Sequence, residues 1–389
     1  MKRIIIACSI FLLLLSGCLP GAPETEPQVV EEGSQDEKVI ISRDIDTTDR
    51  YYRSVLPFYA SDSRGFILDG VDNRLDIDEF ETGLIRLSQS EFDPDDYFIR
   101  DGQILQKKEV QSWIDRRSKD NKKGLNPELG VSESASVKEK LEANKKNPRY
   151  LSFVLEQNYM VEKGDSIELG GITIGVSLNS IYYYSVKDDE GKIHSGEVDL
   201  RSNEGKILEE GKKIAQQIVT DLREKKEAQD VPIIVALYLE ETRESLIPGR
   251  FISVASVGKG KSNIGSWENL DERHYLFPSD EVTKDHRSDA EKFNNFKTQV
   301  ESFFPNFTGV IGKGFYKNGE LRKMTVEIPM QFHGKSELIA FAQHVTDIVA
   351  SQFLADDIPL EVNITSMDKQ EAVIVKSPDR KEPFVHIYR

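Results

Sequence analysis

The stretches ITIGVSL, at residues 172–178, and MTVEIPM, at residues 324–330, decide which fold the sequence predicts. In both stretches an apolar residue occupies every second position, which is typical of a strand with one buried face. An amphipathic helix pattern follows each strand, with apolar residues between 207 and 222 in the first case and between 338 and 349 in the second. A second strand and a further β-rich run come after each helix, so each stretch begins a strand–helix–strand–strand unit.

The two units resemble each other in sequence as well as in pattern. Residues 215–232 align with residues 342–359 without a gap, from a shared Ala-Gln pair to a shared proline. Each proline stands at the entry of the following strand, where its missing N–H is tolerated. We interpret the pair as a divergent duplication, with chance similarity of short apolar patterns as the alternative. The first unit is longer, because a hairpin-like segment at residues 182–198 separates its first strand from its helix.

These patterns predict an α+β fold with two tandem divergent repeats, each an antiparallel or mixed sheet covered by a helix. We expect repeat 1 at residues 161–290 and repeat 2 at residues 291–389. A mixed, partly helical N-terminal region is expected at residues 49–160, because parts of it have apolar residues at helical spacing. Within that region, the polar residues 118–147 are expected to form an exposed loop that is poorly ordered in places.

Residues 1–17 have the three parts of a secretory signal peptide. Two cations at positions 2 and 3 precede an uncharged apolar run, which is shorter than the roughly 20 residues of a membrane-spanning helix. The end of this run resembles a bacterial lipobox, so we expect a lipid to be attached to its cysteine. An ordinary secretory signal with an incidental cysteine is the alternative. The lipobox residues are Leu15, Ser16 and Gly17, and the lipid attachment residue is Cys18.

Residues 18–48 are rich in Pro, Glu, Gln, Ser and Asp and almost free of aromatic residues. Such a segment cannot bury enough apolar surface to offset its chain entropy. We therefore expect a lipid-anchored, disordered tether that holds the folded part away from the membrane. An ordered strand around residues 39–41 is the alternative.

The overall composition limits the classes of partner. The 389-residue chain has a formal net charge of −16, which argues against a nucleic acid partner and against electrostatic adsorption to anionic lipid. Contact with a membrane is therefore expected through a covalent anchor. The two cysteines are Cys8, which leaves with the signal peptide, and Cys18, so no intramolecular disulfide is expected in the mature domain.

Known catalytic and metal-binding motifs are absent from the sequence. The six histidines lack the spacing of HExxH, and there is no GxSxG motif and no mature thiol. The segment GKGKS at residues 258–262 lacks the first glycine and the following helix of a phosphate-binding loop. The acidic residues 69–80 lack the glycine and the final glutamate of an EF-hand. We therefore expect no catalytic residues, no metal, no cofactor and no enzymatic activity.

One group of aromatic residues is a candidate for ligand recognition. Tyr182, Tyr183 and Tyr184 are consecutive, and exposed aromatic side chains favour binding. The same residues also fit the alternating packing of a strand, in which case they are structural. Both interpretations are open from the sequence.

Several short motifs in a fixed order resemble the CamS family of sex-pheromone precursor lipoproteins of Gram-positive bacteria. The likeness covers essentially the whole chain, and it agrees with tandem repeats after a tether. Besides the lipobox, the motifs are YRSVLPF at residues 52–58, GLNP at 124–127, SIYYY at 180–184, IPGRFI at 247–252 and KEPFVHIY at 381–388.

The resemblance implies a function for the signal peptide. In such precursors, the residues before the lipid-bearing cysteine are released as a short hydrophobic peptide that induces conjugative plasmid transfer. The implied partners are lipoprotein-processing enzymes and a pheromone receptor, and the implied location is the outer face of the cytoplasmic membrane, held by acyl chains such as palmitate. The alternative function is a surface lipoprotein that binds an extracellular ligand or envelope polymer. The candidate pheromone residues are Phe11, Leu12, Leu13, Leu14, Leu15, Ser16 and Gly17.

Overall fold

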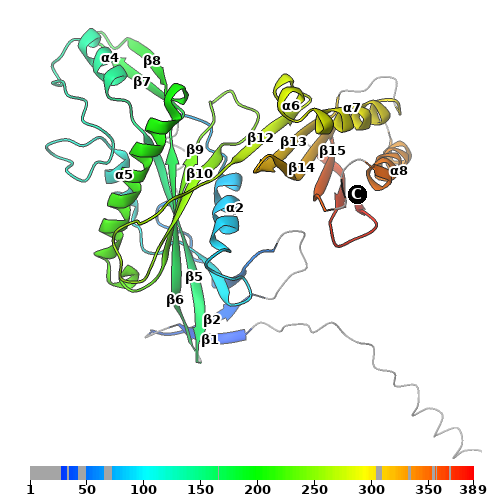
Figure 1. Cartoon of the computed structure of the whole chain (residues 1–389), viewed down its shortest axis with the longest axis horizontal. Helices are drawn as coiled ribbons and strands as arrows, with labels where there is room; N and C mark the ends of the chain where they lie inside the picture. Colours follow the sequence, from blue (N-terminus) through cyan, green and yellow to red (C-terminus); the bar gives the residue numbers. More distant parts are fainter. Residues whose placement is uncertain are drawn as a thin grey trace, which may run out of the picture.

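The computed structural model describes residues 28–32, 35–42, 50–64, 72–164, 166–303, 309–331, 334–352, 355, 357–367 and 369–389. Within these residues the strands form a nine-stranded sheet, a six-stranded sheet and a two-stranded hairpin (Figure 1).

The nine-stranded sheet is covered by helices on both of its faces. Alternate side chains of its strand β9 belong to different cores: Val235 and Leu237 pack with helix α5, whereas Ala236 and Tyr238 pack with helix α2. The strand therefore reads as a continuous apolar run, as expected where both faces are buried. In spatial order the sheet contains β1 (Gln28–Glu32), β2 (Gln35–Ile41), β3 (Arg53–Leu56), β4 (Tyr97–Asp101), β5 (Leu151–Lys163), β6 (Ser166–Leu178), β9 (Ile233–Leu239), β10 (Arg250–Val257) and β11 (Glu268–Asn269). The helices around it are α2 (Ile77–Ser88), α3 (Lys107–Ile114), α4 (Val137–Lys146) and α5 (Glu204–Arg223).

The six-stranded sheet has a separate core, which joins its inner face to helices α7 and α8. Phe293 and Phe296 of α7 and Phe341 and Val345 of α8 are fully buried in this core. In spatial order the sheet contains β12 (Glu272–Phe277), β13 (Ile311–Lys317), β14 (Glu320–Pro329), β15 (Leu360–Ser366), β16 (Lys369–Lys376) and β17 (Phe384–Ile387). Its helices are α6 (Asp280–Asp285), α7 (Arg287–Glu301) and α8 (Lys335–Gln352).

The two sheets contain the same strand–helix–strand–strand unit, which confirms the predicted α+β repeats. In each, a strand pairs in parallel with the strand after its helix, and that strand pairs antiparallel with the next one: β6–β9–β10 and β14–β15–β16. The equivalence extends to single hydrogen bonds. The backbone N–H of Ile172 donates to the carbonyl oxygen of Pro232 at 3.1 Å, and the N–H of Met324 donates to that of Pro359 at 3.0 Å.

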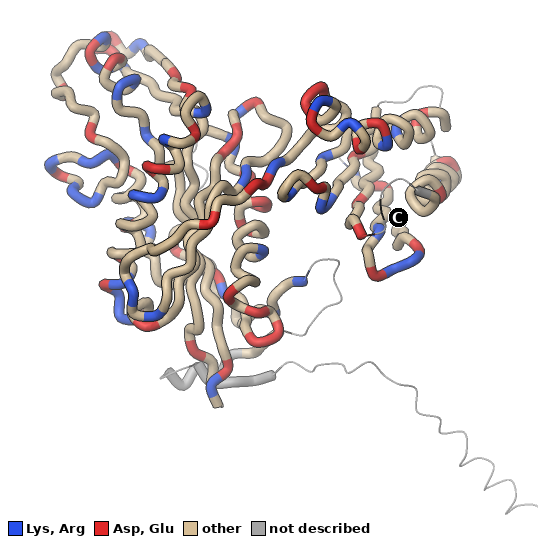
Figure 2. Tube along the Cα trace, in the orientation of Figure 1, with Lys and Arg blue, Asp and Glu red and all other residues tan. Residues whose placement is uncertain are grey.

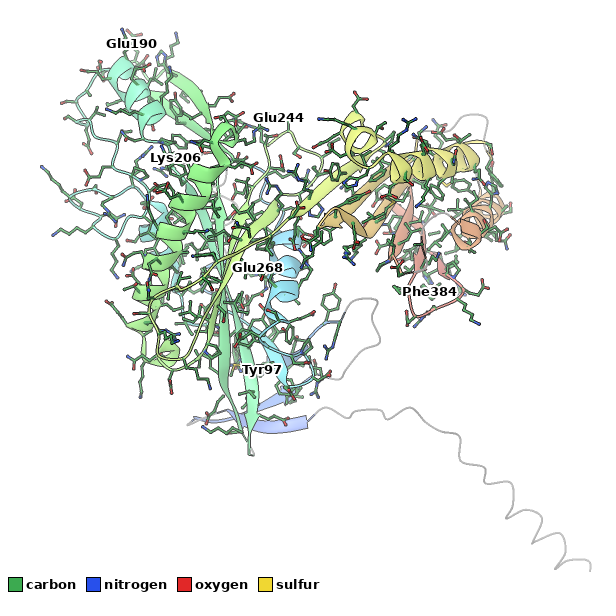
Figure 3. All side chains as sticks on the ribbon, viewed as in Figure 1. Tyr97, Glu190, Lys206, Glu244, Glu268 and Phe384 are labelled. Atoms are coloured by element: carbon green, nitrogen blue, oxygen red, sulfur yellow. The ribbon has the colours of Figure 1, made fainter. Side chains whose placement is uncertain are left out.

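The additional segment of the first repeat is a hairpin, as its pattern predicted. It is formed by β7 (Ile181–Lys187) and β8 (Ile193–Asp199). Helix α4 packs beside it, and together they stand at the end of the molecule opposite the six-stranded sheet (Figure 1). Glu190, in the turn between the two strands, lies at the tip of this end, whereas exposed Phe384 lies in the six-stranded sheet (Figure 3).

Helix α2 connects the first unit to the second. The guanidinium of Arg86 contacts Glu79 of its own helix at 3.2 Å and Glu272 of β12 at 3.0 Å, and it lies 4.5 Å from the ring centre of Phe315. Burial alone would lower the pKa of Arg86, but the two carboxylates outweigh it and raise this pKa. The carboxylate of Glu272 is almost completely buried, so Arg86 compensates a charge that water does not reach.

The structure differs from three boundaries expected from the sequence. The tether predicted over residues 18–48 contains β1 and β2, because Ile41 is fully buried in a small apolar cluster and β2 pairs with β3. The second sheet begins at β12 rather than at residue 291, since β12 pairs with β13 along its whole length. A boundary at residue 161 divides β5, which pairs with β6 from Leu151 onward.

Candidate functional site

A pocket of about 500 Å³ lies beside the β7–β8 hairpin. Most of its lining residues come from the segment after α3, helix α4, the start of β5, and β7. This volume lies within the range of cavities that bind small molecules. Among the described residues of the second unit the hairpin has no counterpart, so this wall belongs to the first repeat.

The three consecutive tyrosines line this pocket. The alternation of β7 places Tyr182 and Tyr184 on one face, where their rings stack with centres 5.4 Å apart. Tyr183 is covered by the guanidinium of Arg243, 3.5 Å from its ring centre. All three side chains are buried by more than nine-tenths, so they both pack against the core and contribute to the pocket wall.

Tyr182 also holds a polar cluster at the pocket wall. Its hydroxyl donates a hydrogen bond to Oδ1 of Asn144 at 2.6 Å and accepts one from Nη2 of Arg116 at 2.9 Å. The same nitrogen of Arg116 donates to Asn144 at 3.2 Å, and Nη1 donates to the carbonyl oxygen of Pro127 at 2.8 Å. Arg116 is therefore fixed at the pocket by neutral acceptors, and no carboxylate takes part in this cluster.

The segment that carries Arg116 is held by a buried asparagine. Asn126 donates to the carbonyl oxygens of Ile114 and Leu151, and its Oδ1 accepts from the N–H groups of Tyr150 and Leu151. One side chain thus joins the end of α3 to the start of β5. Asn126 belongs to the GLNP motif, so this motif fixes the segment beside the pocket.

Helix α4 corrects the prediction of a poorly ordered loop over residues 118–147. It begins with a capping box in which Ser136 and Glu139 satisfy each other's backbone N–H groups. The Ser-x-x-Glu spacing was the sequence signal for this helix, but the surrounding polar composition obscured it. The helix matters for the site because it presents Lys140 and Asn144 to the pocket.

A buried carboxyl group lies close to the pocket floor. Ser152 and Asn179 line the pocket, and Glu240 is fully buried and accepts a hydrogen bond from Oγ of Ser177 at 2.6 Å. Burial raises the pKa of Glu240 to about 7, although hydrogen bonds from Ser177, Ser152 and Asn73 oppose the increase. This carboxyl group therefore titrates near neutral pH.

The predicted N-terminal sites lie outside the described residues. They comprise the lipobox, the lipid attachment residue Cys18 and the candidate pheromone residues 11–17. In the part of the chain that the structure describes, no helix has the length and hydropathy needed to cross a membrane. The described histidines and acidic residues also form no group placed to hold a metal ion.

The sequence did not predict the four basic residues that line the pocket. Their positions in the sequence follow no shared period or motif, and folding alone brings them together. Figure 2 shows further Lys and Arg positions in the loop between α3 and α4, on the same side of the molecule. The basic residues that line the pocket are Arg116, Lys140, Arg149 and Lys187.

Comparison with known proteins identifies relatives for nearly the whole chain. A family model described as "CamS sex pheromone cAM373 precursor" matches residues 58–382. The crystal structure of a sex pheromone precursor from Lactobacillus salivarius subsp. salivarius UCC118 is similar, with a TM-score of 0.78 and 30% sequence identity. That similarity covers 90% of this chain and 99% of the other.

A second structure is similar over the same fold. It is the C-terminal domain of the sex pheromone staph-cAM373 precursor from Staphylococcus aureus, with a TM-score of 0.66 and 30% identity over 80% of this chain and 96% of the other. No curated protein matches the sequence.

Proposed function

The chain belongs to the CamS family of sex pheromone precursors, and we propose that it is a lipid-anchored surface protein whose signal peptide is processed to a short hydrophobic peptide. The observation that carries the proposal is the order of residues 1–18: two cations, an uncharged apolar run, and Leu-Ser-Gly before Cys18. The proposal places the folded part on the outer face of the cytoplasmic membrane and assigns no catalytic activity to it.

The two cysteines of the chain allow a matched test of the anchor. Cys18→Ala removes the sulfur that would carry the lipid, and Cys8→Ala removes the other thiol inside the apolar run. We expect Cys18→Ala to lose incorporation of a labelled fatty acid and to leave the membrane fraction or remain unprocessed. Cys8→Ala should behave as the wild type. Fatty acid labelling and membrane retention of Cys18→Ala at the wild-type level would contradict the anchor.

The pheromone part of the proposal is tested separately. A synthetic peptide of residues 11–17 (FLLLLSG) should increase plasmid transfer from a responsive donor strain, measured as the conjugation frequency. A scrambled peptide of the same composition controls for hydrophobicity. Equal transfer frequencies with both peptides across a panel of donors would reject the pheromone while leaving the anchor in place.

We also propose that the folded part binds an extracellular ligand. The observation in favour is the pocket of about 500 Å³ next to the inserted hairpin, with Tyr182, Tyr183 and Tyr184 in its wall. A panel of sugars, polyols, amino acids and organic acids is screened by thermal shift against the full-length protein in detergent. We expect at least one ligand whose effect disappears when the pocket is altered, and a panel without any stabilising ligand would contradict the proposal.

A further inference from the structure

The pocket is positively charged although the chain as a whole is strongly acidic. Arg116, Lys140, Arg149 and Lys187 line it, and Asp72 is the single acidic residue among the described lining residues. These four cations come from four different segments, so their convergence results from the tertiary fold. With a net charge of −16 on the whole chain, such a local excess of positive charge needs a specific explanation.

The two arginines have no carboxylate partner among the described residues. Arg116 donates to Pro127, Asn144 and Tyr182, which are all neutral. Nε of Arg149 is buried and has no hydrogen-bond partner within the described part of the chain. Burial lowers the pKa of Arg116, and the positive charge of Arg149 lowers it further, so the two like charges lie close enough to repel each other.

Two other arginines of this protein have carboxylate partners. Arg86 contacts both Glu79 and Glu272, and Arg250 contacts both oxygens of Glu204 at 2.9 Å. A partly buried guanidinium is normally stabilised by such a charged partner. At the pocket, a bound anion would supply the negative charge that the described residues do not provide.

We propose that this pocket binds a phosphate ester carried on a small polyol or sugar. Two guanidinium groups and two ammonium groups against one carboxylate favour a doubly charged oxyanion over a single carboxylate. A volume of about 500 Å³ accommodates more than a phosphate group, and the stacked rings of Tyr182 and Tyr184 provide a flat apolar wall for the carbon skeleton. This inference rests on the proposed ligand-binding function.

The test is isothermal titration of the full-length protein in detergent. The probes are sn-glycerol 3-phosphate, inorganic phosphate, acetate and glycerol. We expect sn-glycerol 3-phosphate to bind most tightly, inorganic phosphate more weakly, and acetate and glycerol not measurably. Tighter binding of glycerol or acetate than of the two phosphates would overturn the proposal.

Arg149→Met gives the residue-level test, because it removes the charge and keeps an apolar side chain of similar length. The matched control is Arg201→Met, since Arg201 is exposed and pairs with Asp199 outside the pocket. We expect at least about tenfold weaker binding of sn-glycerol 3-phosphate by Arg149→Met and unchanged binding by Arg201→Met. Equal affinity of Arg149→Met and wild type would overturn the site.

Two further comparisons distinguish a polymeric from a soluble phosphate ligand, and distinguish failure of the phosphate proposal from failure of ligand binding itself. A poly(glycerol phosphate) chain that binds more tightly per chain than the free ester assigns the ligand to a polymer of the envelope, and the reverse assigns it to a soluble metabolite. Binding of a neutral ligand from the thermal-shift panel, without any phosphate binding, would reject the phosphate class and retain ligand binding. No binding by either set would reject both.

Discussion

As the pH rises, the titration of Glu240 should lower the free energy of unfolding of the wild type. We expect this decrease to be absent from the Glu240→Gln variant. Glu240 is fully buried at the end of the central strand of the first unit, and its carboxyl group accepts a hydrogen bond from Ser177. Burial raises its pKa from 4.5 to about 7. The native state therefore keeps this proton at pH values at which the unfolded chain has lost it, so the free energy of unfolding falls as the pH rises from about 4.5 to about 7.

The size of the effect follows from the two pKa values. A difference of about 2.5 pH units corresponds to about 3 kcal/mol at roughly 1.4 kcal/mol per unit, and about 2 kcal/mol of it falls between pH 5.5 and 8.5. Glutamine has no titrating proton, so this part of the pH dependence should vanish in Glu240→Gln. The substitution can also change the free energy of unfolding by an amount that does not depend on pH. This amount cancels when the difference between wild type and variant at one pH is subtracted from the difference at the other.

The assay is guanidinium unfolding followed by tryptophan fluorescence at about pH 5.5 and about pH 8.5. Both tryptophans of the chain, Trp113 and Trp267, pack in the core of the first unit, so the signal reports the unit that contains Glu240. Glu197→Gln, at an exposed position of β8, is the control and should show the wild-type pH dependence. A stability difference between Glu240→Gln and wild type that is the same at both pH values would contradict the raised pKa of Glu240.

Three further changes test the packing around the site and between the units. Arg86→Met leaves the buried carboxylate of Glu272 with only the more distant ammonium of Lys317, at 3.9 Å. We expect it to destabilise the protein by about 3 kcal/mol, measured by thermal unfolding, with earlier proteolysis between the two sheets. Asn126→Ala removes four hydrogen bonds to the backbone and should cost about 3 kcal/mol in denaturant unfolding, against about 1 kcal/mol for loss of the helix cap in Asn203→Ala. Gly124→Ala should lower the melting temperature, because its Cβ would lie 2.4 Å from a backbone nitrogen; an unchanged melting temperature would contradict that contact.

The repeat architecture was predictable because its signals are local and occur twice. The alternation at residues 172–178 and 324–330, the helix pattern after each, and the prolines at 232 and 359 all act within one element. The structure aligns them through equivalent hydrogen bonds from Ile172 to Pro232 and from Met324 to Pro359. The local sequence pattern was therefore sufficient to predict the two strand–helix–strand–strand units.

The candidate site was predictable only in part, for a physical reason. The three tyrosines could be found because they are consecutive and fit a strand pattern, and β7 places them at the pocket wall. The approach of Arg116 to Arg149 depends on a loop fixed by Asn126 and on helix α4, neither of which has a strong apolar period. Residues that make long-range polar contacts of this kind follow no regular spacing in the sequence, so no pattern predicts them.

We propose that the mature protein begins at Cys18 and carries a lipid on it. The most direct measurement is mass spectrometry of the N-terminal proteolytic fragment of the protein purified from its native membrane. We expect a fragment that starts at Cys18 and carries the added mass of a diacylglyceryl group on its sulfur. A fragment with an unmodified Cys18 thiol, or a mature N-terminus at another residue, would overturn the lipid anchor.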